Sequence, residues 1–221
     1  MNFPLCPRFQ AVLFDMDGTL LDTLSDMQDA VNHILLENGW PQRTLEEIRA
    51  FVGNGAAKLM ERAIPEPIAP QRFQEILASY KDWYQAHNCV KTAPYPGIPE
   101  VLAELEKMGV KTDVVSNKPD ATTKALAEKF FPGMPALGQR DGVDPKPSPA
   151  LVAQALSALG VRPENAVYVG DSEVDVATAR NAGLPLIAVS WGFRGRAELE
   201  SAGADYVVDT QDELAALILG E

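Results

Sequence analysis

Short apolar runs alternate with helical segments through most of the chain, and this alternation constrains the fold more than any other feature. Five runs rich in valine, isoleucine or leucine have the length of strands: 10–15, 111–117, 166–171, 184–190 and 204–210. Near-continuous apolar strands separated by helices are typical of a parallel sheet with both faces covered. The sequence therefore predicts an α/β fold with a doubly wound, Rossmann-like parallel-sheet core.

Residues 24–90 interrupt this alternation, because they contain several helical patterns and no convincing strand. Thr44 and Glu47 have the spacing of a capping box, in which each side chain accepts a hydrogen bond from the other residue's backbone. We therefore expect 24–90 to form an α-helical cap domain, inserted into an α/β catalytic core made of 1–23 and 91–221.

Composition and charge argue against several classes of function. The chain has 19 Lys and Arg against 31 Asp and Glu, a net charge of −12, which disfavours binding to nucleic acid phosphates. No apolar run approaches the ~20 residues that span a bilayer, and the first residues lack the pattern of a secretory signal. We expect a cytoplasmic protein that binds neither nucleic acid nor membrane. Monomer and homodimer both stay open.

Chemically active side chains follow the carboxyl ends of the expected strands, where open α/β sheets bind their ligands. They are Asp15, Asp17, Ser116, Asn117, Asp171 and Asp175, with Lys146 between the second and third runs. Neighbouring carboxylates such as Asp15 and Asp17 raise one another's pKa. A hard divalent cation removes this conflict, and Mg²⁺ combines carboxylate ligands with water and substrate phosphate. The pattern therefore indicates Mg²⁺-assisted phosphoryl chemistry.

These residue types suit the transfer of a phosphoryl group, in which catalysis is mostly positioning and electrostatic stabilisation. Asp15 is the candidate nucleophile and would form an aspartyl-phosphate. Asp17 is the candidate acid for the leaving alcohol and base for the hydrolytic water. Lys146 is the candidate cation that neutralises both the phosphate and the nucleophile. The candidate phosphate-binding residues are Gly18, Thr19, Ser116, Asn117 and Lys146.

Four segments, "DMDGTLLDT", "VVSNK", "DPKP" and "VGDSEVD", resemble in order and context the four motifs of the haloacid dehalogenase-like superfamily. The resemblance spans essentially the whole chain and implies the same roles for Asp15 and Asp17, with Ser116 and Lys146 as phosphate binders. It also implies that Mg²⁺ is held by Asp15, Asp17 through its backbone carbonyl, and Asp171. Asp175 would either be a further ligand or support these ligands. Ser172 is a candidate for the same supporting role or only the N-cap of the helix that follows.

Within that superfamily, "SNKP", "PYPG", "SWGFRG", "GADYVVD" and "FVGNGAAKLMERA" resemble phosphoglycolate phosphatases. Asp17 favours a phosphatase over a dehalogenase, because the dehalogenase branch lacks this second aspartate. The resemblance implies a phosphomonoester hydrolase that acts on a small phosphorylated metabolite, with 2-phosphoglycolate as the leading substrate. A sugar-phosphate phosphatase, a phosphomutase and a non-catalytic phosphate-binding sensor are the alternatives.

Three cap residues, Gly53, Asn54 and Gly55, have two interpretations. They form either a flexible break between helices or a loop that enters the active site and selects the substrate.

Overall fold

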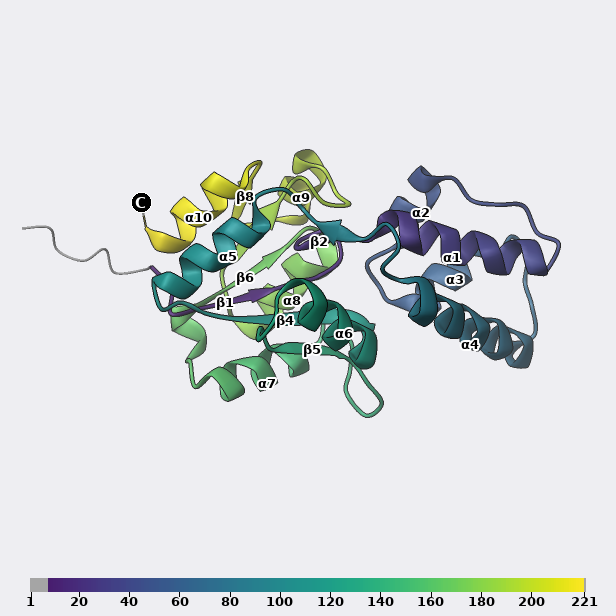
Figure 1. Cartoon of the computed structure of the whole chain (residues 1–221), viewed down its shortest axis with the longest axis horizontal. Coiled ribbons are helices and arrows are strands. Elements are labelled where there is room, and N and C mark those ends of the chain that lie inside the picture. Colours follow the sequence, from purple (N-terminus) through teal and green to yellow (C-terminus); the bar gives the residue numbers. More distant parts are fainter. Residues whose placement is uncertain (1–7, 221) are drawn as a thin grey trace, which may run out of the picture. The chain divides into compact units, whose positions relative to one another are not determined.

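The chain divides into two compact units, Met1–Leu21 with Pro94–Glu221 and Asp22–Ala93, of which the computed structural model describes residues 8–220 (Figure 1). The first unit contains a six-stranded sheet in the order β5-β4-β1-β6-β7-β8, with every neighbouring pair parallel. The strands are β1 (Ala11–Phe14), β4 (Lys111–Pro119), β5 (Ala136–Gln139), β6 (Ala166–Gly170), β7 (Leu186–Val189) and β8 (Tyr206–Val208). The predicted α/β class with a parallel sheet is confirmed.

Helices separate these strands and bury the sheet. They are α5 (Ile98–Lys107), α6 (Asp120–Phe130), α7 (Ala150–Leu159), α8 (Glu173–Ala182), α9 (Arg196–Ala202) and α10 (Gln211–Leu219), with a 3₁₀ turn at Pro163–Asn165. Residues of α7, α8 and α9 pack in one apolar cluster with side chains of β1, β4, β6 and β7. All residues of β1 are buried, so both faces of the sheet are covered, as the continuous apolar runs require.

Strand β5 lies at one edge of the sheet and was not among the five predicted strands. Its sequence, "ALGQ", lacks the apolar run that marked the others. Gly138 is required there by packing, because a Cβ atom would lie 2.5 Å from Asp120 Cα and 2.6 Å from the Lys118 carbonyl oxygen. Tertiary contact with the start of α6 thus decides a position that strand propensity disfavours.

The second unit is helical, as expected for an inserted cap. It contains α1 (Leu24–Glu37), α2 (Leu45–Phe51), α3 (Ala56–Ala63) and α4 (Pro70–His87). The predicted capping box is confirmed: Glu47 N donates to Thr44 Oγ1 over 3.2 Å, and Thr44 N donates to Glu47 Oε2 over 2.8 Å. At the points where the chain enters and leaves this unit, β2 (Leu21–Asp22) and β3 (Ala93–Pro94) pair in a two-stranded sheet.

A buried carboxylate in the first turn of α1 holds the last residues of the helical unit. Asp26 accepts hydrogen bonds from the backbone N–H groups of Val90, Lys91 and Thr92 and from the Thr92 hydroxyl, at 2.8 to 3.0 Å. Hydrogen bonds to a charged acceptor are stronger than neutral ones. Asp26 therefore fixes the path of the chain as it leaves the helices.

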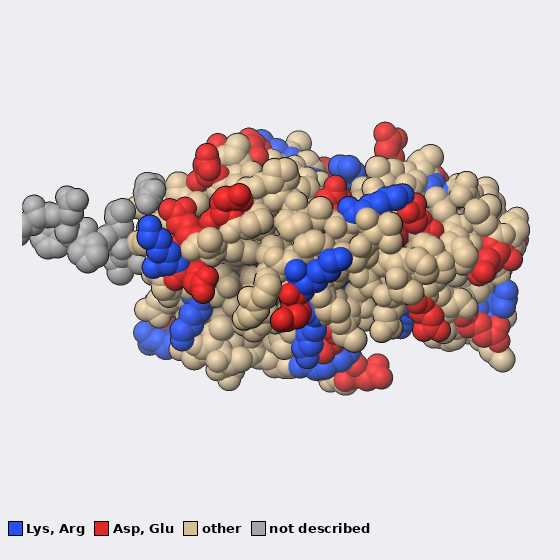
Figure 2. Space-filling model, in the orientation of Figure 1, with Lys and Arg blue, Asp and Glu red and all other residues tan. Residues whose placement is uncertain are grey.

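Charged side chains of both signs share the surface (Figure 2). On the face shown in Figure 2, Lys and Arg side chains are interspersed with Asp and Glu, and no large basic patch is visible. Among the described residues, no helix is both long and apolar enough to cross a membrane.

One acidic side chain of the sheet is buried with one of its oxygen atoms unpaired. Asp113 of β4 is 1% exposed and pairs in register with Leu13 of β1, so the two side chains share a face of the sheet. Its Oδ1 atom is buried without a hydrogen-bond partner. Burial raises the pKa of Asp113 to about 6, although a backbone hydrogen bond from Val114 opposes the shift.

We expect the substitution Asp113→Val to stabilise the protein at pH 8. Because the folded pKa lies above the unfolded value, ionised Asp113 destabilises the fold fully above pH 6 and not at all well below pH 4. Removing the carboxylate should raise the free energy of unfolding by about 1–3 kcal/mol at pH 8. Urea unfolding of both proteins at pH 8 and pH 4.5 checks this, and a gain that does not shrink at the lower pH would contradict it.

Candidate active site

The predicted site residues gather at the carboxyl edge of the first unit's sheet. Asp15 follows β1, Ser116 lies near the end of β4, and Asp171 follows β6. Strand β1 has β4 on one side and β6 on the other, so the winding of the sheet reverses direction beside β1. Such a switch point leaves a crevice beyond the strand ends where α/β proteins bind ligands.

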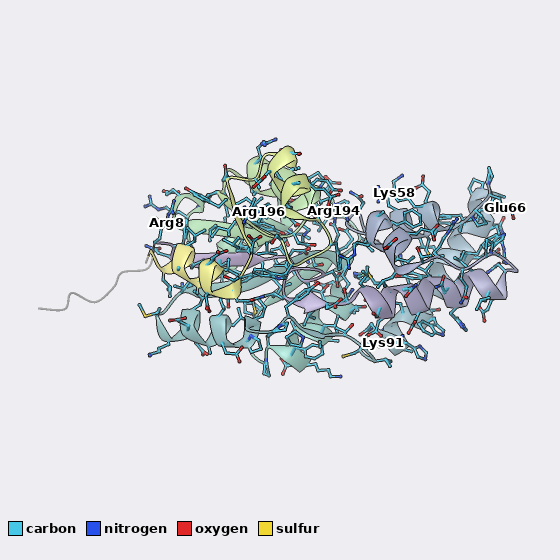
Figure 3. All side chains as sticks on the ribbon, turned by 90° about the horizontal axis from the view of Figure 1, so that it is seen from above. Arg8, Lys58, Glu66, Lys91, Arg194 and Arg196 are labelled. Carbon is cyan, nitrogen blue, oxygen red and sulfur yellow. The ribbon has the colours of Figure 1, made fainter. Side chains whose placement is uncertain are left out.

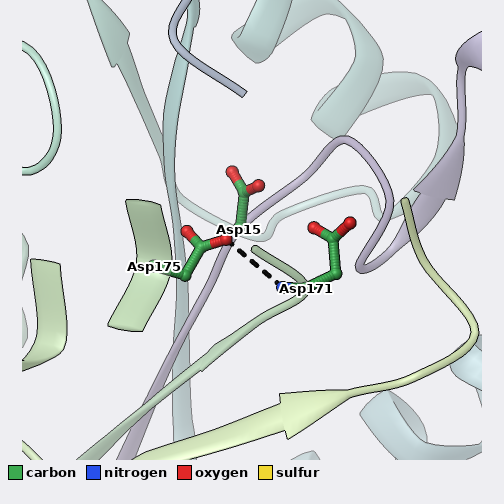
Figure 4. Close-up of side chains that lie close together, drawn as sticks. All are labelled: Asp15, Asp171 and Asp175. Carbon is green, nitrogen blue, oxygen red and sulfur yellow. Dashed lines mark hydrogen bonds between the residues drawn. The ribbon is translucent and has the colours of Figure 1, made fainter. Parts of the chain in front are cut away.

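Three carboxylates form a tight cluster at this edge of the sheet (Figure 4). Asp15, Asp171 and Asp175 are all buried and each offers an oxygen within 4.8 Å of the other two. The backbone N–H of Asp171 donates to Asp175 Oδ2 over 3.2 Å, the bond that is dashed in Figure 4.

Electrostatics explain why such a cluster suits a cation. The pKa of Asp15 is raised to about 7, mainly by burial and also by Asp175 and Asp17, against the opposing Lys146 ammonium. The pKa of Asp171 is raised well above its usual value by burial and by Asp175 and Asp15. A bound divalent cation would offset this repulsion, and clustered carboxylate oxygens are the ligands that hard cations prefer. The cluster therefore fits a metal ion.

Asp175 differs from the other two carboxylates because donors surround it. Its Oδ2 accepts from the N–H groups of Asp171 and Ser172 and from the Ser172 hydroxyl, and its Oδ1 accepts from Lys146 Nζ over 2.8 Å. Ser172 is the N-cap residue of α8, and Asp175 completes a capping box with it. These contacts suit a residue that supports the cluster more than one that offers free ligand atoms.

Lys146 is the cationic centre of the site. Its ammonium lies 2.8 Å from Asp15 Oδ1, 2.8 Å from Asp175 Oδ1 and 3.0 Å from the Tyr168 hydroxyl. Burial lowers the pKa of Lys146, but Asp15 and Asp175 outweigh burial and hold that pKa well above its usual value. The ammonium thus stays charged beside the candidate nucleophile.

The carboxylate of Asp17 pairs with Lys118 and is not part of the three-carboxylate cluster. Lys118 Nζ lies 2.8 Å from Asp17 Oδ1 and 3.0 Å from Oδ2, and both side chains are largely buried. The side chains that meet are those of Asp15, Asp171 and Asp175. Metal binding by Asp17 was predicted through its backbone carbonyl and stays a prediction. Two residues two positions apart in an extended segment would share a face, but the chain bends at Met16, between Asp15 and Asp17, and turns again after Asp17.

Gly18 and Thr19 were expected to offer backbone N–H groups to phosphate. In the structure these N–H groups donate to carbonyl oxygens within the turn. Gly18 N donates to the Leu21 carbonyl over 2.9 Å and Thr19 N donates to the Met16 carbonyl over 3.4 Å. The Thr19 hydroxyl instead donates to Asp171 Oδ1 over 3.2 Å. The turn therefore orients a carboxylate of the cluster, and phosphate binding by Gly18 and Thr19 stays a prediction.

Asn117 and Ser116 of β4 divide their roles. The Asn117 carboxamide donates to the Lys146 carbonyl over 3.0 Å and accepts from the Lys146 N–H over 2.7 Å. It therefore holds the Lys146 backbone, and its predicted contact with phosphate stays a prediction. The buried Ser116 hydroxyl accepts from Lys118 N over 3.2 Å and stays available as a donor.

The loop 190–195 adds contacts to this site that sequence reasoning did not find. Phe193 N donates to Asp171 Oδ2 over 2.7 Å, and the Trp191 indole donates to the Thr19 carbonyl over 3.1 Å. A Cβ atom on Gly192 would lie 2.4 Å from Asp171 Cβ and 2.4 Å from the Gly18 carbonyl oxygen. The sequence signal for these contacts was Gly192 between two aromatic residues, because a glycine lets the backbone come close to another part of the chain.

Arg194 of the same loop is labelled in Figure 3. Its Nε lies 3.0 Å from Glu173 Oε2 at the start of α8, so the ion pair joins the loop to the helix that carries Asp175.

The three cap residues remain a prediction. They lie between α2 and α3, where Gly53 and Gly55 adopt φ values of 115° and 84° that favour glycine. Asn54 Oδ1 accepts from Arg62, which also donates to the Phe51 carbonyl over 2.6 Å. Arg62 thus orders the loop within the helical unit.

Comparison with known proteins agrees with the geometry of the first unit. A family model for haloacid dehalogenase-like hydrolases matches residues 12–189. The chain belongs to the haloacid dehalogenase-like hydrolase family.

Relatives place the chain near the phosphoglycolate phosphatases of that family. It is 35% identical over 205 residues to a phosphoglycolate phosphatase of Caulobacter vibrioides, covering 89% of this chain and 85% of that protein. It is 33% identical over 211 residues to an N-acetylmuramic acid 6-phosphate phosphatase of Pseudomonas aeruginosa, covering 94% and 93%. The crystal structure of a proposed phosphoglycolate phosphatase from Lactobacillus delbrueckii superposes with a TM-score of 0.91 at 37% identity, covering 96% and 99%. The protein is thus a phosphatase of the phosphoglycolate phosphatase-like subgroup.

Proposed function

We propose that the protein is a Mg²⁺-dependent phosphomonoester hydrolase whose first candidate substrate is 2-phosphoglycolate. The observation that carries the proposal is the buried group of Asp15, Asp171 and Asp175 beyond the switch point of the sheet. Two of these carboxylates, Asp15 and Asp175, lie 2.8 Å from the Lys146 ammonium. Phosphoryl transfer through an aspartyl-phosphate needs a carboxylate nucleophile, a positive charge beside the phosphoryl group and a bound metal ion. The site offers candidates for all three.

In the first step, an oxygen of Asp15 attacks phosphorus and the bond to the substrate alcohol breaks, which leaves an aspartyl-phosphate. Asp17 gives its proton to the leaving alcohol oxygen. In the second step, Asp17 takes a proton from water, the water oxygen attacks phosphorus, and inorganic phosphate leaves with Asp15 restored.

Electrostatics assign the supporting roles. Lys146, 2.8 Å from Asp15, keeps one positive charge beside the reacting oxygens. The hydroxyl of Ser116 donates to the phosphoryl group. Mg²⁺ bound by Asp15 and Asp171 would supply charge neutralisation of the carboxylates and the substrate. A protonated carboxyl is a poor nucleophile, and the pKa of Asp15 is raised to about 7 in the metal-free protein. A bound cation would lower this pKa and keep Asp15 ionised.

Two substrate classes deserve a direct comparison. The likeness to phosphoglycolate phosphatases favours a phosphorylated hydroxy acid, and the likeness to an N-acetylmuramic acid 6-phosphate phosphatase favours a phosphorylated sugar. The core residues would serve both, since both classes of substrate present the same phosphomonoester group to them.

The test is a phosphate-release assay over small phosphomonoesters, each with MgCl₂ and with EDTA. We expect release only with Mg²⁺ and the highest kcat/KM for 2-phosphoglycolate. A higher value for N-acetylmuramic acid 6-phosphate would transfer the assignment to sugar phosphates. A rearranged sugar phosphate without free phosphate would indicate a mutase, and phosphate binding without any turnover would indicate a sensor.

A further inference from the structure

Tyr168 places a buried hydroxyl group in the middle of β6, a strand whose other residues are alanine, valine and glycine. Its side chain is 0% exposed and packs in the apolar cluster with β1, α7 and α8. Its hydroxyl donates to the Val115 carbonyl over 3.1 Å and accepts from Lys146 Nζ over 3.0 Å. Burial raises the pKa of Tyr168 well above its usual value, so the hydroxyl keeps its proton and can donate.

These two bonds fix the direction in which the hydroxyl faces Lys146. Because its proton goes to Val115, a lone pair is left toward the ammonium. An ammonium has three protons, and Lys146 has three acceptors: Asp15, Asp175 and Tyr168. Tyr168 is the neutral member of this set, so it orients the ammonium without adding another negative charge.

A second contact fixes the other end of Lys146. The Asn117 carboxamide pairs with both the N–H and the carbonyl of Lys146. Val115 and Asn117 flank Ser116 on β4, so both contacts tie Lys146 to the strand that carries the phosphate-binding serine. The residues around Lys146 otherwise lie in a loop between β5 and α7.

The geometry points to Tyr168 and Asn117 as positioning residues that lock Lys146 to the strand bearing Ser116. This inference rests on the proposed function, in which Lys146 and Ser116 stabilise the same phosphoryl group. Preorganised charge and donors act on the transition state without rearranging during the reaction. The pair therefore sets the rate of the chemical step more than the binding of substrate.

The test compares Tyr168→Phe with Tyr206→Phe in the Mg²⁺-loaded full-length protein. Tyr206 is the control, because it lies in β8 of the same sheet. Among the described residues, its hydroxyl has one hydrogen-bond partner, Arg8, which donates to it over 3.2 Å. For Tyr168→Phe we expect kcat for phosphate release to fall about tenfold, the effect of one lost hydrogen bond to a charged group, with KM nearly unchanged. The control should keep the kcat of the unmodified protein.

A second measurement reads Lys146 without any assay of activity. Hydrogen exchange at the ¹⁵N-labelled ammonium of Lys146, followed by NMR, should be faster in Tyr168→Phe and unchanged in Tyr206→Phe. If the unmodified protein releases no phosphate from any ester, the proposed function fails, and this exchange rate alone decides whether Tyr168 holds the ammonium.

Several outcomes would overturn the inference. They are an unchanged kcat together with unchanged ammonium exchange in Tyr168→Phe, an equal loss of kcat in Tyr206→Phe, or a rise in KM in place of a fall in kcat. If Tyr168→Phe does not fold, Asn117→Ala takes its place in the kcat and KM comparison. It should also lower kcat about tenfold with little change in KM, and an unaltered kcat would overturn the inference.

Discussion

Replacing Asp15 by asparagine will lower phosphate release by at least about a thousandfold, the scale of losing a catalytic nucleophile. The amide cannot attack phosphorus, and no other carboxylate lies in the same position after β1. The fold should survive, because Asn keeps an oxygen that can accept from Lys146 Nζ, 2.8 Å away. Initial rates with 2-phosphoglycolate and Mg²⁺, with thermal unfolding of the same samples, check both statements.

The matched control is Asp82→Asn, the same change at an exposed aspartate of α4. This variant should keep full activity. If Asp15→Asn retained more than a tenth of the activity of the unmodified protein, Asp15 would not be the nucleophile, and the covalent mechanism would have to be abandoned.

The substitution Asp171→Asn should separate the binding of metal from folding. Asp171 accepts from Phe193 N over 2.7 Å and from the Thr19 hydroxyl over 3.2 Å, and an amide of the same shape can keep the bond from Phe193. Activity with Mg²⁺ should be lost almost completely, because one of the two carboxylates proposed to bind the cation is gone.

Stability should respond in opposite directions with and without Mg²⁺. The pKa of Asp171 is raised by burial and by Asp175 and Asp15, so the ionised group destabilises the metal-free fold at neutral and higher pH. This cost disappears as pH falls below the usual carboxyl range. In EDTA at pH 8 the variant should therefore be at least as stable as the unmodified protein, and any advantage should shrink as the pH is lowered.

Added Mg²⁺ should reverse the order. A ligand at 100 times its Kd stabilises the protein that binds it by about 2.7 kcal/mol, and only the unmodified protein should gain this. Urea unfolding in EDTA and in MgCl₂ measures both effects. Equal stabilisation of the two proteins by Mg²⁺ would show that Asp171 is not a ligand.

Much of the core followed from local pattern. The runs at 10–15, 111–117, 166–171, 184–190 and 204–210 each coincide with a strand. The signal is clearest in β1, β6 and β7, whose residues are all buried and mostly apolar, as a parallel sheet covered on both faces requires. The exception was β5, whose Gly138 is set by the close approach of Asp120 and not by strand propensity. Within β5, Leu137 and Gln139 are only partly buried, so the strand lacks a continuous apolar run.

The sequence by itself determined the fold class, the edge of the sheet at which chemistry occurs and the residue types present there. It could do so because parallel strands bring their carboxyl ends to one edge. Only the tertiary structure decided which of these side chains meet. Thr19 donates a hydrogen bond to Asp171, which lies 152 positions later in the sequence. Lys146 donates to Asp175, which lies 29 positions later. Such contacts depend on how turns and loops direct each side chain after its strand ends, so Asp175 joins the cluster, Asp17 pairs with Lys118, and Tyr168 and Asn117 hold Lys146.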